Sequence, residues 1–149
     1  MIRNAVKEDL PQIIELGRVM HAEARRLNKL TYVPAKVFLT MSSLIDNEEA
    51  FLRVAEEDGE LIAGLAAIVK THWYSTDKMA YDLALFVRPD KRGGLTAARL
   101  IKEYVAWAKA HDAVIVQFGI STGVHLASTG ALLERLGFKP SGFLYDATE

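Results

Sequence analysis

The stretch that decides the fold reads Leu83-Ala84-Leu85-Phe86-Val87-Arg88-Pro89-Asp90-Lys91-Arg92-Gly93-Gly94-Leu95-Thr96-Ala97-Ala98-Arg99-Leu100. Its first part, up to residue 87, has the composition of a strand, and from Leu95 onward apolar side chains recur at helical spacing. Between the two lies a basic turn that contains Gly93 and Gly94. Backbone amides at a helix N-terminus lack partners and carry partial positive charge, so this turn can hold a pyrophosphate. An ordinary strand-to-helix turn with a solvated basic cluster is the alternative interpretation.

On both sides of this stretch, the sequence predicts further strands and helices. The Glu57-Asp58-Gly59 turn is typical of a β-hairpin, and Gly137 is a natural residue to end a helix. The segments expected as strands are residues 2–4, 50–56, 60–70, 81–87, 113–119, 138–139 and 143–146, and those expected as helices are residues 9–27, 35–45, 95–108 and 125–136. This order predicts an α/β (α+β) fold, in which a mixed, mostly antiparallel central sheet of six to seven strands is flanked by about four helices.

Composition limits the classes of protein to which the chain can belong. Its 149 residues, 50% hydrophobic and 25% charged, fit one globular domain over residues 1–149. A formal net charge of -1 provides no attraction to nucleic acid or to an anionic membrane. There is no cysteine, which excludes disulfides, thiolate metal ligands and a cysteine nucleophile. The N-terminus lacks a long apolar run, and residues 61–69 are too few to span a bilayer, so we expect a cytoplasmic protein.

Two segments resemble motifs of the GNAT (Gcn5-related) N-acetyltransferase superfamily. Residues 87–100 look like its acetyl-CoA motif, whose core is Arg/Gln-x-x-Gly-x-Gly/Ala between a strand ending in Val-x-Pro and an amphipathic helix. The second segment is similar to the family's ending Leu-Tyr-x-x-Leu-Gly-Phe, and reads Leu132-Leu133-Glu134-Arg135-Leu136-Gly137-Phe138-Lys139. Together with the order of the elements, they extend the resemblance over nearly the whole chain.

The resemblance implies one GNAT-like acyltransferase domain that moves an acetyl group from acetyl-CoA to a primary amine of a small molecule, peptide or protein, without a metal. It implies a cleft for the acyl-CoA between strands 81–87 and 114–119. The residues expected to bind acetyl-CoA are Leu85, Phe86, Val87, Arg92, Gly93, Gly94, Leu95, Thr96 and Ala97. Main-chain groups of the first three are expected to hold the pantetheine arm. Residues 23–26 lie where the family usually sets acceptor specificity, or else form a solvated helix face.

Two side chains are candidates for proton transfer. The attacking amine must be neutral, which requires a base, and Asp82 lies on a strand expected to line the cleft, where partial desolvation raises the pKa of a carboxyl group. A solvent-facing or salt-bridged carboxylate is the alternative interpretation. Leu133 stands where the family often has a tyrosine acid, so Tyr145 is the candidate replacement, or else a core or edge aromatic residue. Ser121 and Thr122 can reach the leaving thiolate, or simply begin a loop or cap the next helix.

Two other functions compete with an active transferase. The first is a catalytically silent domain of the same fold that binds acyl-CoA or a protein partner. Leu133, and Leu126 near the place of an asparagine that is common in the family, keep this alternative open. The second, a nucleotide-binding α/β domain, is disfavoured because the turn lacks the Gly-x-Gly-x-x-Gly spacing and the Lys-Ser/Thr of a P-loop. His111 and His125 lack the spacing of a metal site. Edge strands at the C-terminus are compatible with a homodimer.

Overall fold

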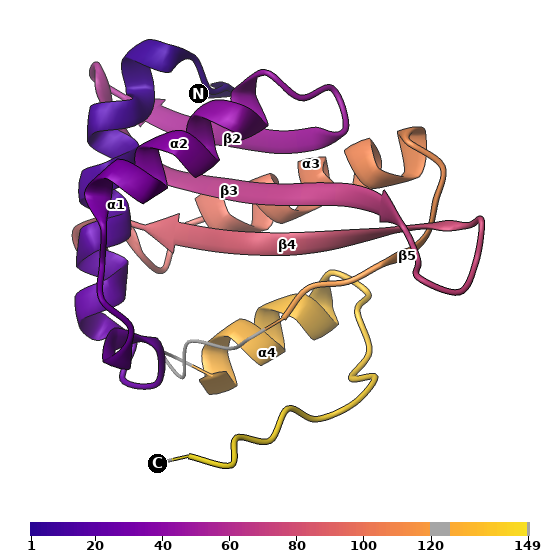
Figure 1. Ribbon diagram of the computed structural model, residues 1–149. Helices are drawn as coiled ribbons and strands as arrows, with labels where there is room; N and C mark the ends of the chain where they lie inside the picture. The colour runs from indigo at the N-terminus through magenta and orange to yellow at the C-terminus, as the bar shows by residue number, and fades with distance from the viewer. Residues whose placement is uncertain (120–125, 149) are drawn as a thin grey trace.

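The computed structural model describes residues 1–119 and 126–148, which form strands and helices around one sheet (Figure 1). The strands are β1 (Ile2–Asn4), β2 (Ala50–Glu57), β3 (Glu60–Thr71), β4 (Lys78–Val87) and β5 (Ala113–Val116). The helices are α1 (Leu10–Glu23), α2 (Pro34–Ile45), α3 (Thr96–Ala110) and α4 (Leu126–Arg135), and the short 3-10 helices are η1 (Lys7–Asp9), η2 (Leu27–Lys29) and η3 (Pro89–Lys91). The described residues therefore form an α/β fold with four helices and a mixed sheet of five strands.

The sheet is covered by helices on both faces. Its strands lie in the order β1-β2-β3-β4-β5. The pairs β1–β2, β2–β3 and β3–β4 are antiparallel, and the pair β4–β5 is parallel. α1 and α2 cover one face and α3 covers the other (Figure 1). Successive residues of β3 enter the two cores in turn: Leu65 packs in the core that contains Tyr104 of α3, and Ala66 in the core that contains Leu10 of α1. A strand buried on both faces needs a nearly continuous apolar sequence, which β3 has.

Two turns have the conformations that their sequences predict. Between β2 and β3, Asp58 and Gly59 have positive φ angles of 53° and 80°, as a two-residue hairpin turn requires. After α4, Gly137 has a φ of 94°. Phe138 N–H then donates to the Leu133 carbonyl at 3.0 Å, as in a Schellman motif. The predicted hairpin and the predicted helix end are both confirmed.

β4 and β5 separate part of the way along the sheet. β5 pairs only with residues 78–80 of β4. In the described residues, the final backbone hydrogen bond between the two runs from Gln117 N–H to the Ala80 carbonyl, at 3.0 Å. The rest of β4 continues to residue 87 without a described strand along its outer edge. The sheet is therefore open there as a wedge.

A β-bulge marks the point where the wedge begins. On the inner side of β4, Ala66 pairs with Ala84 and Ala67 pairs with Asp82, so that Leu83 is an extra residue on β4. A bulge bends its strand and increases the local twist. The part of β4 that follows Leu83 is thus turned away from the direction that β5 takes.

The predicted number of strands, six to seven, is wrong, because the described chain forms five. Residues 138–139 and 143–146, expected to be closing strands, do not form a strand. Phe143, Leu144 and Tyr145 are 87, 68 and 86% exposed. A segment with strand-like composition becomes a strand only where it pairs with another strand and packs against neighbours. Residues 143–146 do neither.

Two predicted elements are shorter in the structure. The first helix ends at Glu23 rather than near residue 27, because Ala24 leaves the helical region with a ψ of 87°. The strand expected over residues 113–119 ends at Val116, because the chain leaves β4 after Gln117. The last helix is described from Leu126, and residue 125, its expected first residue, lies outside the described residues. Among the described helices, none combines the length and the apolar character that crossing a bilayer needs.

Candidate active site

A pocket of about 420 Å³ lies in the wedge where β4 and β5 separate. Its walls come from β4, the end of α1, the loop that leads into α3, the segment after β5, and α4. Most of the residues expected to bind acetyl-CoA line it, namely Leu85, Phe86, Val87, Arg92, Gly93, Gly94 and Ala97. Leu95 and Thr96 do not line it, and Leu95 is 68% exposed.

The outer edge of β4 forms one long wall of the pocket. All six residues 82–87 line it. Because no described strand pairs with this edge, the main-chain groups that would bond to a neighbouring strand face the wedge instead. Phe86 is buried, and its ring lies so close to Gly64 of β3 that an added β-carbon there would be 2.4 Å from it. Gly64 therefore allows Phe86 to lie against β3 rather than farther out in the pocket.

The loop before α3 forms one end of the pocket. Gly93 has a φ of 87°, which favours glycine, and no atom lies within 4 Å of a β-carbon added at Gly93 or at Gly94. The main chain is thus accessible on this side. Leu95, the N-cap residue of α3, provides no side-chain hydrogen bond to the first turn. The first amides of an α-helix have no partner within the helix, and Ala97 of the first turn of α3 lines this end of the pocket.

Two of the three cations near this loop are bound to acidic side chains of the β2–β3 hairpin. Lys91 Nζ lies 2.9 Å from Glu57 Oε1, and Arg88 lies 3.0 Å from Glu60 and 2.7 Å from Asp90. These contacts raise the pKa values of Lys91 and Arg88. The basic cluster that the sequence predicts is therefore neutralised locally. Glu57 and Glu60 lie roughly 30 residues away in the chain, and no sequence pattern connects them to the loop.

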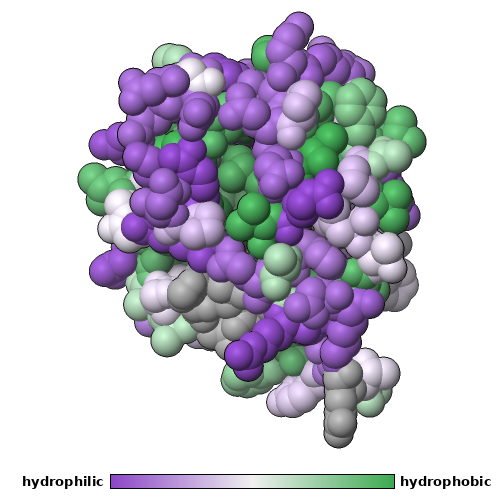
Figure 2. Space-filling model, turned by 90° about the vertical axis from the view of Figure 1, so that its left-hand side faces the viewer, coloured by the Kyte–Doolittle hydropathy of each residue, from purple (hydrophilic) through white to green (hydrophobic). Residues whose placement is uncertain are grey.

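The third cation, Arg92, crosses the pocket. Its Nη1 and Nη2 each lie 2.7 Å from an oxygen of Glu23, at the end of α1, and its Nε donates to the Val87 carbonyl at 3.2 Å. The hydrogen bonds to Glu23 raise the pKa of Arg92. From the sequence, Glu23 was expected in an acceptor-binding or solvated region, whereas in the structure it lies in the wall of the expected cofactor site. Figure 2 shows the side of the molecule that carries α1, where hydrophilic residues surround smaller groups of hydrophobic ones.

Asp82 lies at the other end of the pocket and is half-buried. Its Oδ1 accepts a hydrogen bond from Gly119 N–H at 2.9 Å. Burial raises the pKa of Asp82, and the Gly119 bond opposes this with a smaller effect. In the described part of the chain Asp82 forms no ion pair, and its side chain is partly exposed where it lines the pocket. Tyr81, its neighbour, points to the opposite face, where Lys70 Nζ lies 5.4 Å from its ring centroid.

The segment after β5 is held near Asp82 by side chains instead of strand pairing. Tyr104 of α3 is fully buried and donates to the Gln117 carbonyl at 2.7 Å. Burial, and to a smaller extent the charge of Asp82, raise the pKa of Tyr104, so its hydroxyl stays protonated and keeps donating. Together with the Asp82–Gly119 bond, this contact ties the segment after β5 to α3 and to β4.

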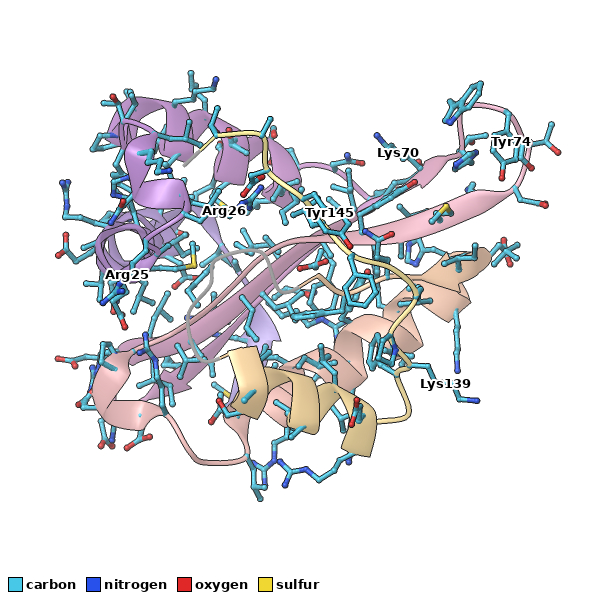
Figure 3. All side chains as sticks on the ribbon, turned by 90° about the horizontal axis from the view of Figure 1, so that it is seen from below. Arg25, Arg26, Lys70, Tyr74, Lys139 and Tyr145 are labelled. Carbon is cyan, nitrogen blue, oxygen red and sulfur yellow. The ribbon has the colours of Figure 1, made fainter. Side chains whose placement is uncertain are left out.

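Tyr145, the expected proton donor, does not line the pocket. Figure 3 shows it on the C-terminal segment, with Arg26 on one side and Lys70 on the other. Asp146, the next residue, forms an ion pair with Arg26. The structure therefore does not bring Tyr145 together with Asp82. Residues 121 and 122, the other hydroxyl candidates, lie outside the described residues.

α4 contributes residues to the pocket that the sequence analysis missed. Ser128, Thr129, Leu132 and Arg135 line it, whereas Leu133, matched to the tyrosine of the family, is buried in the core beside α3. The spacing of residues 128, 132 and 135 is that of one helix face, so helical periodicity could have found them. Residues 72–74 form the aromatic tip of the β3–β4 hairpin and do not line the pocket. No group of three or more potential metal ligands occurs among the described residues.

Comparisons with known proteins address the family and the fold of the chain. The model of the acetyltransferase (GNAT) family matches residues 19–138. Among solved structures, an aminoglycoside 6′-N-acetyltransferase from Acinetobacter haemolyticus is 21% identical with a TM-score of 0.73, over 100% of this chain and 98% of that chain. A glucosamine-6-phosphate N-acetyltransferase from Arabidopsis thaliana is 14% identical with a TM-score of 0.76, over 99% and 97%. A GCN5-related N-acetyltransferase from Ralstonia eutropha is 20% identical with a TM-score of 0.77, over 99% and 97%. The search of curated proteins gives no significant match.

The match to the family model defines the class of the protein. It spans residues 19–138, which is well over half of the chain and includes β4, the loop before α3 and α4. The chain therefore belongs to the GNAT family of acetyltransferases. The solved structures, at these identities, establish the shared fold.

Proposed function

We propose that this chain is an N-acetyltransferase that moves an acetyl group from acetyl-CoA to a primary amine of a small molecule, peptide or protein. It acts as one GNAT-like domain over residues 1–149, in the cytoplasm and without a metal. One observation carries most of this proposal: the pocket runs from the glycine turn before α3 along β4 to Asp82. One end offers amides and a cation to a diphosphate, and the other offers a carboxylate to an amine. Acyl transfer needs both within one pocket.

The residues of the pocket fit acetyl-CoA, which supplies the activated thioester carbonyl. The main chain at Gly93 and Gly94 is accessible, and the first amides of α3 follow directly, so residues 93–97 are proposed to bind the diphosphate. Arg92 is the proposed cation, because a guanidinium can bind a phosphate with two parallel hydrogen bonds. Leu95 and Thr96 are proposed to act through their main-chain N–H groups. The exposed edge of residues 85–87 is proposed to bind the pantetheine arm, since its amides can pair there as another strand would.

Asp82 is proposed as the general base. While the C–N bond forms and the C–S bond breaks, the amine loses a proton, and a carboxylate beside it can accept that proton. Burial raises the pKa of Asp82, which makes its carboxylate a stronger base than an exposed one. The leaving thiolate needs a proton in return. Tyr145 stays a prediction for that donor, and Ser128 and Thr129 are hydroxyl groups already in the wall of the pocket.

A silent acyl-CoA-binding domain remains the second candidate, because Leu133 is part of the core and supplies no acid to the pocket. Both candidates predict that acetyl-CoA binds and raises the midpoint of thermal unfolding, because it binds only the native state. They differ in free-thiol release when acetyl-CoA is mixed with a panel of primary amines. Thiol release that depends on one amine supports the transferase. Binding without release for every amine tested supports the silent domain.

The variant Gly94→Glu tests where the diphosphate binds. A carboxylate at this position repels phosphate, while the open space around Gly94 lets the fold accept the longer side chain. We expect the affinity for CoA, measured by isothermal titration calorimetry, to fall at least about tenfold, with the free energy of unfolding changed by less than about 0.5 kcal/mol. Gly142→Glu is the matched control, since Gly142 also has open space but lies outside the pocket. Equal CoA affinity in both variants contradicts the proposed diphosphate site.

A further inference from the structure

The ion pair between Arg92 and Glu23 joins two separate segments of the pocket wall. Arg92 belongs to the loop before α3, and Glu23 is the last residue of α1, 69 positions earlier in the chain. Both nitrogen–oxygen distances are 2.7 Å, so the carboxylate occupies the two-pronged edge of the guanidinium. The two side chains are 30 and 31% exposed. This contact is therefore a partly buried, bidentate pair rather than a chance meeting of surface charges.

Arg92 also contacts the end of β4. Its Nε donates to the Val87 carbonyl at 3.2 Å, on the edge where the pantetheine arm is proposed to pair. In this arrangement the guanidinium lies between the end of β4 and the end of α1. The hydrogen bonds to Glu23 occupy the guanidinium edge, and the one to Val87 occupies the carbonyl, that acetyl-CoA needs under the proposed function. A diphosphate can therefore bind the two-pronged edge of Arg92 only by replacing Glu23.

The other ion pairs of the loop differ in this respect. Glu57, the partner of Lys91, and Glu60, a partner of Arg88, extend from the β2–β3 hairpin and do not line the pocket. Among the described ion pairs, Glu23–Arg92 is the one in which both members belong to the pocket wall. Loss of Glu57 or Glu60 leaves the pocket wall as it is, whereas loss of Glu23 removes the group that holds Arg92 against α1.

We infer that Glu23 is an internal competitor for the diphosphate of the cosubstrate and lowers the affinity of the enzyme for CoA. Carboxylate and phosphate bind the same edge of a guanidinium, so each CoA molecule that uses Arg92 displaces Glu23 from it. Glu23 thereby selects for ligands that carry a diphosphate, because a neutral thioester has no anionic group that can replace the Glu23 carboxylate on Arg92. This inference rests on the proposed function, since it requires CoA to bind in this pocket.

The test is isothermal titration calorimetry with CoA and with ADP at about 0.15 M salt, where charges more than about 8 Å apart in solvent are largely screened. We expect Glu23→Gln to bind CoA about three- to tenfold more tightly than the parent, the size of effect typical of a partly exposed ion pair. ADP carries the diphosphate without the pantetheine arm, so its affinity should increase by a similar factor. Glu23→Asp keeps the charge but shortens the side chain, so its affinity for CoA should lie between that of the parent and that of Glu23→Gln. Glu60→Gln removes the same charge near the same loop and should bind like the parent.

The outcomes separate this inference from the proposed function. No binding of CoA to the parent or to any variant overturns both. Binding of CoA to the parent with unchanged or weaker binding to Glu23→Gln overturns the inference alone. A gain of equal size in Glu60→Gln, or a gain for CoA without one for ADP, also overturns it. The unfolding midpoint in urea, measured for each variant without ligand, establishes that the comparison is between folded proteins; a merely structural role of Glu23 predicts a loss of affinity, not a gain.

Discussion

Asp82 is subject to two influences that shift its pKa in opposite directions. Burial disfavours the charged carboxylate and raises the pKa, while the hydrogen bond from Gly119 N–H favours it and lowers the pKa; burial is the larger influence. A raised pKa means that the folded protein holds this proton more tightly than the unfolded chain. Asp82 therefore reduces the free energy of unfolding as the pH rises from its ordinary pKa of 3.8 through the native value. An ionisable group that lies in a pocket although it destabilises the fold is a candidate for a functional role.

The variant Asp82→Asn tests this reading. Asparagine keeps an oxygen that can accept from Gly119 N–H but cannot take a proton from the amine. We expect kcat/KM to fall about 100-fold or more and the acidic limb of its pH profile to disappear, while the free energy of unfolding at neutral pH stays the same or rises. Asp77→Asn, on the exposed β3–β4 turn, is the control and should keep the parent profile. An acidic limb with the parent's apparent pKa in Asp82→Asn shows that another group is the base.

Among the elements of the fold, β4 determines the shape of the pocket. In a regular strand, residues an odd number of positions apart point to opposite faces. Ala80 and Leu85 of β4 both pack in the core beside α3, because the bulge at Leu83 reverses the alternation between them. Phe86 consequently faces the other core, where Gly64 of β3 leaves space for its ring. The strand can thus present six consecutive residues to the pocket while it remains anchored to β3.

The variant Gly64→Ala should disturb both the fold and the pocket. The new methyl group would lie 2.4 Å from the Phe86 ring, so this buried ring must move, and the outer side of β4 is where the pocket lies. We expect a loss of about 1–3 kcal/mol in the free energy of unfolding, measured with urea, and weaker binding of CoA by calorimetry. Gly142→Ala, at a glycine with no atom near an added β-carbon, should leave both unchanged. Parent-like CoA affinity in Gly64→Ala would mean that Phe86 does not form the pocket wall proposed here.

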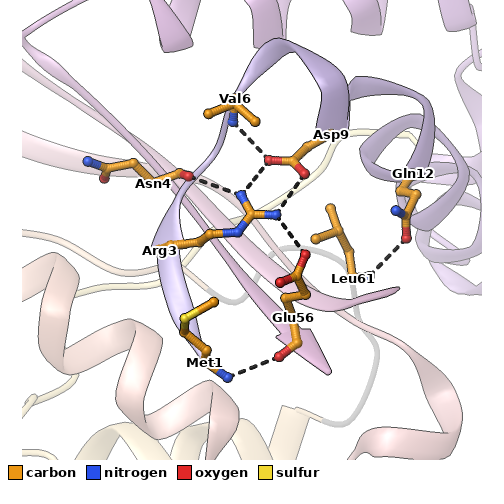
Figure 4. Close-up of polar contacts among 8 residues, drawn as sticks. All are labelled: Met1, Arg3, Asn4, Val6, Asp9, Gln12, Glu56 and Leu61. Carbon is orange, nitrogen blue, oxygen red and sulfur yellow. Dashed lines mark hydrogen bonds and ion pairs between the residues drawn. The ribbon is translucent and has the colours of Figure 1, made fainter. Parts of the chain in front are cut away.

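The stability of the entire chain depends in part on a cluster that ties its N-terminus to the sheet. Asp9 is 5% exposed, and its carboxylate accepts two hydrogen bonds from Arg3, at 2.7 and 2.9 Å, and one from Val6 N–H at 2.8 Å (Figure 4). Arg3 also donates to Glu56 at 3.1 Å, at the end of β2. The Arg3 guanidinium lowers the pKa of Asp9. A lowered pKa stabilises the fold above the ordinary value of 3.8, and this stabilisation is lost as the pH falls through the native value.

The variant Asp9→Asn should therefore destabilise the protein at neutral pH. Its amide cannot accept both hydrogen bonds from Arg3, and we expect a loss of about 2 kcal/mol in the free energy of unfolding, at the lower end for buried pairs because Arg3 keeps contact with water. The difference from the parent should shrink as the pH falls below 3.8, because the parent loses its own carboxylate there. Asp46→Asn, which breaks the exposed Lys7–Asp46 pair, should change stability by less than about 0.5 kcal/mol. A constant difference between Asp9→Asn and the parent across this pH range would contradict the role given to the carboxylate.

Association into a homodimer stays a prediction, but the surface that could mediate it is β5 and not the expected C-terminal strands. The expected C-terminal edge strands are absent, and β5 is the outermost strand beside β4 in the described residues. Val114 and Ile115 of β5 are 69 and 53% exposed, and Phe143 and Tyr145 are exposed as well. An unpaired strand edge with apolar side chains is the kind of surface that pairs with another chain. Sedimentation velocity over a range of protein concentrations measures whether it does so.

Local patterns were enough to predict the family and most of the elements, and they brought together most of the residues that now line the pocket. The strand and helix periodicities around Gly93 and Gly94 depend on neighbours within a few residues, and so do the hairpin at Asp58 and the helix end at Gly137. Seven of the expected cofactor residues consequently line one pocket, and Asp82 lies in the same pocket. The number of strands was not predictable in this way, because residues 143–146 have strand-like composition but no partner to pair with.

The partners of the charged side chains in the site, by contrast, come from distant parts of the chain. Arg92 looked like an unopposed cation, yet Glu23, 69 residues earlier, holds it across the pocket. Asp82 was expected to line the cleft from its place on the strand, but its partner was not predictable: the N–H group of Gly119, 37 residues later in the chain, donates to its carboxylate. Periodicity reports only which face of an element a side chain occupies. Which charges meet depends on how those faces pack, because an ion pair is set by distance in space and not by distance along the chain.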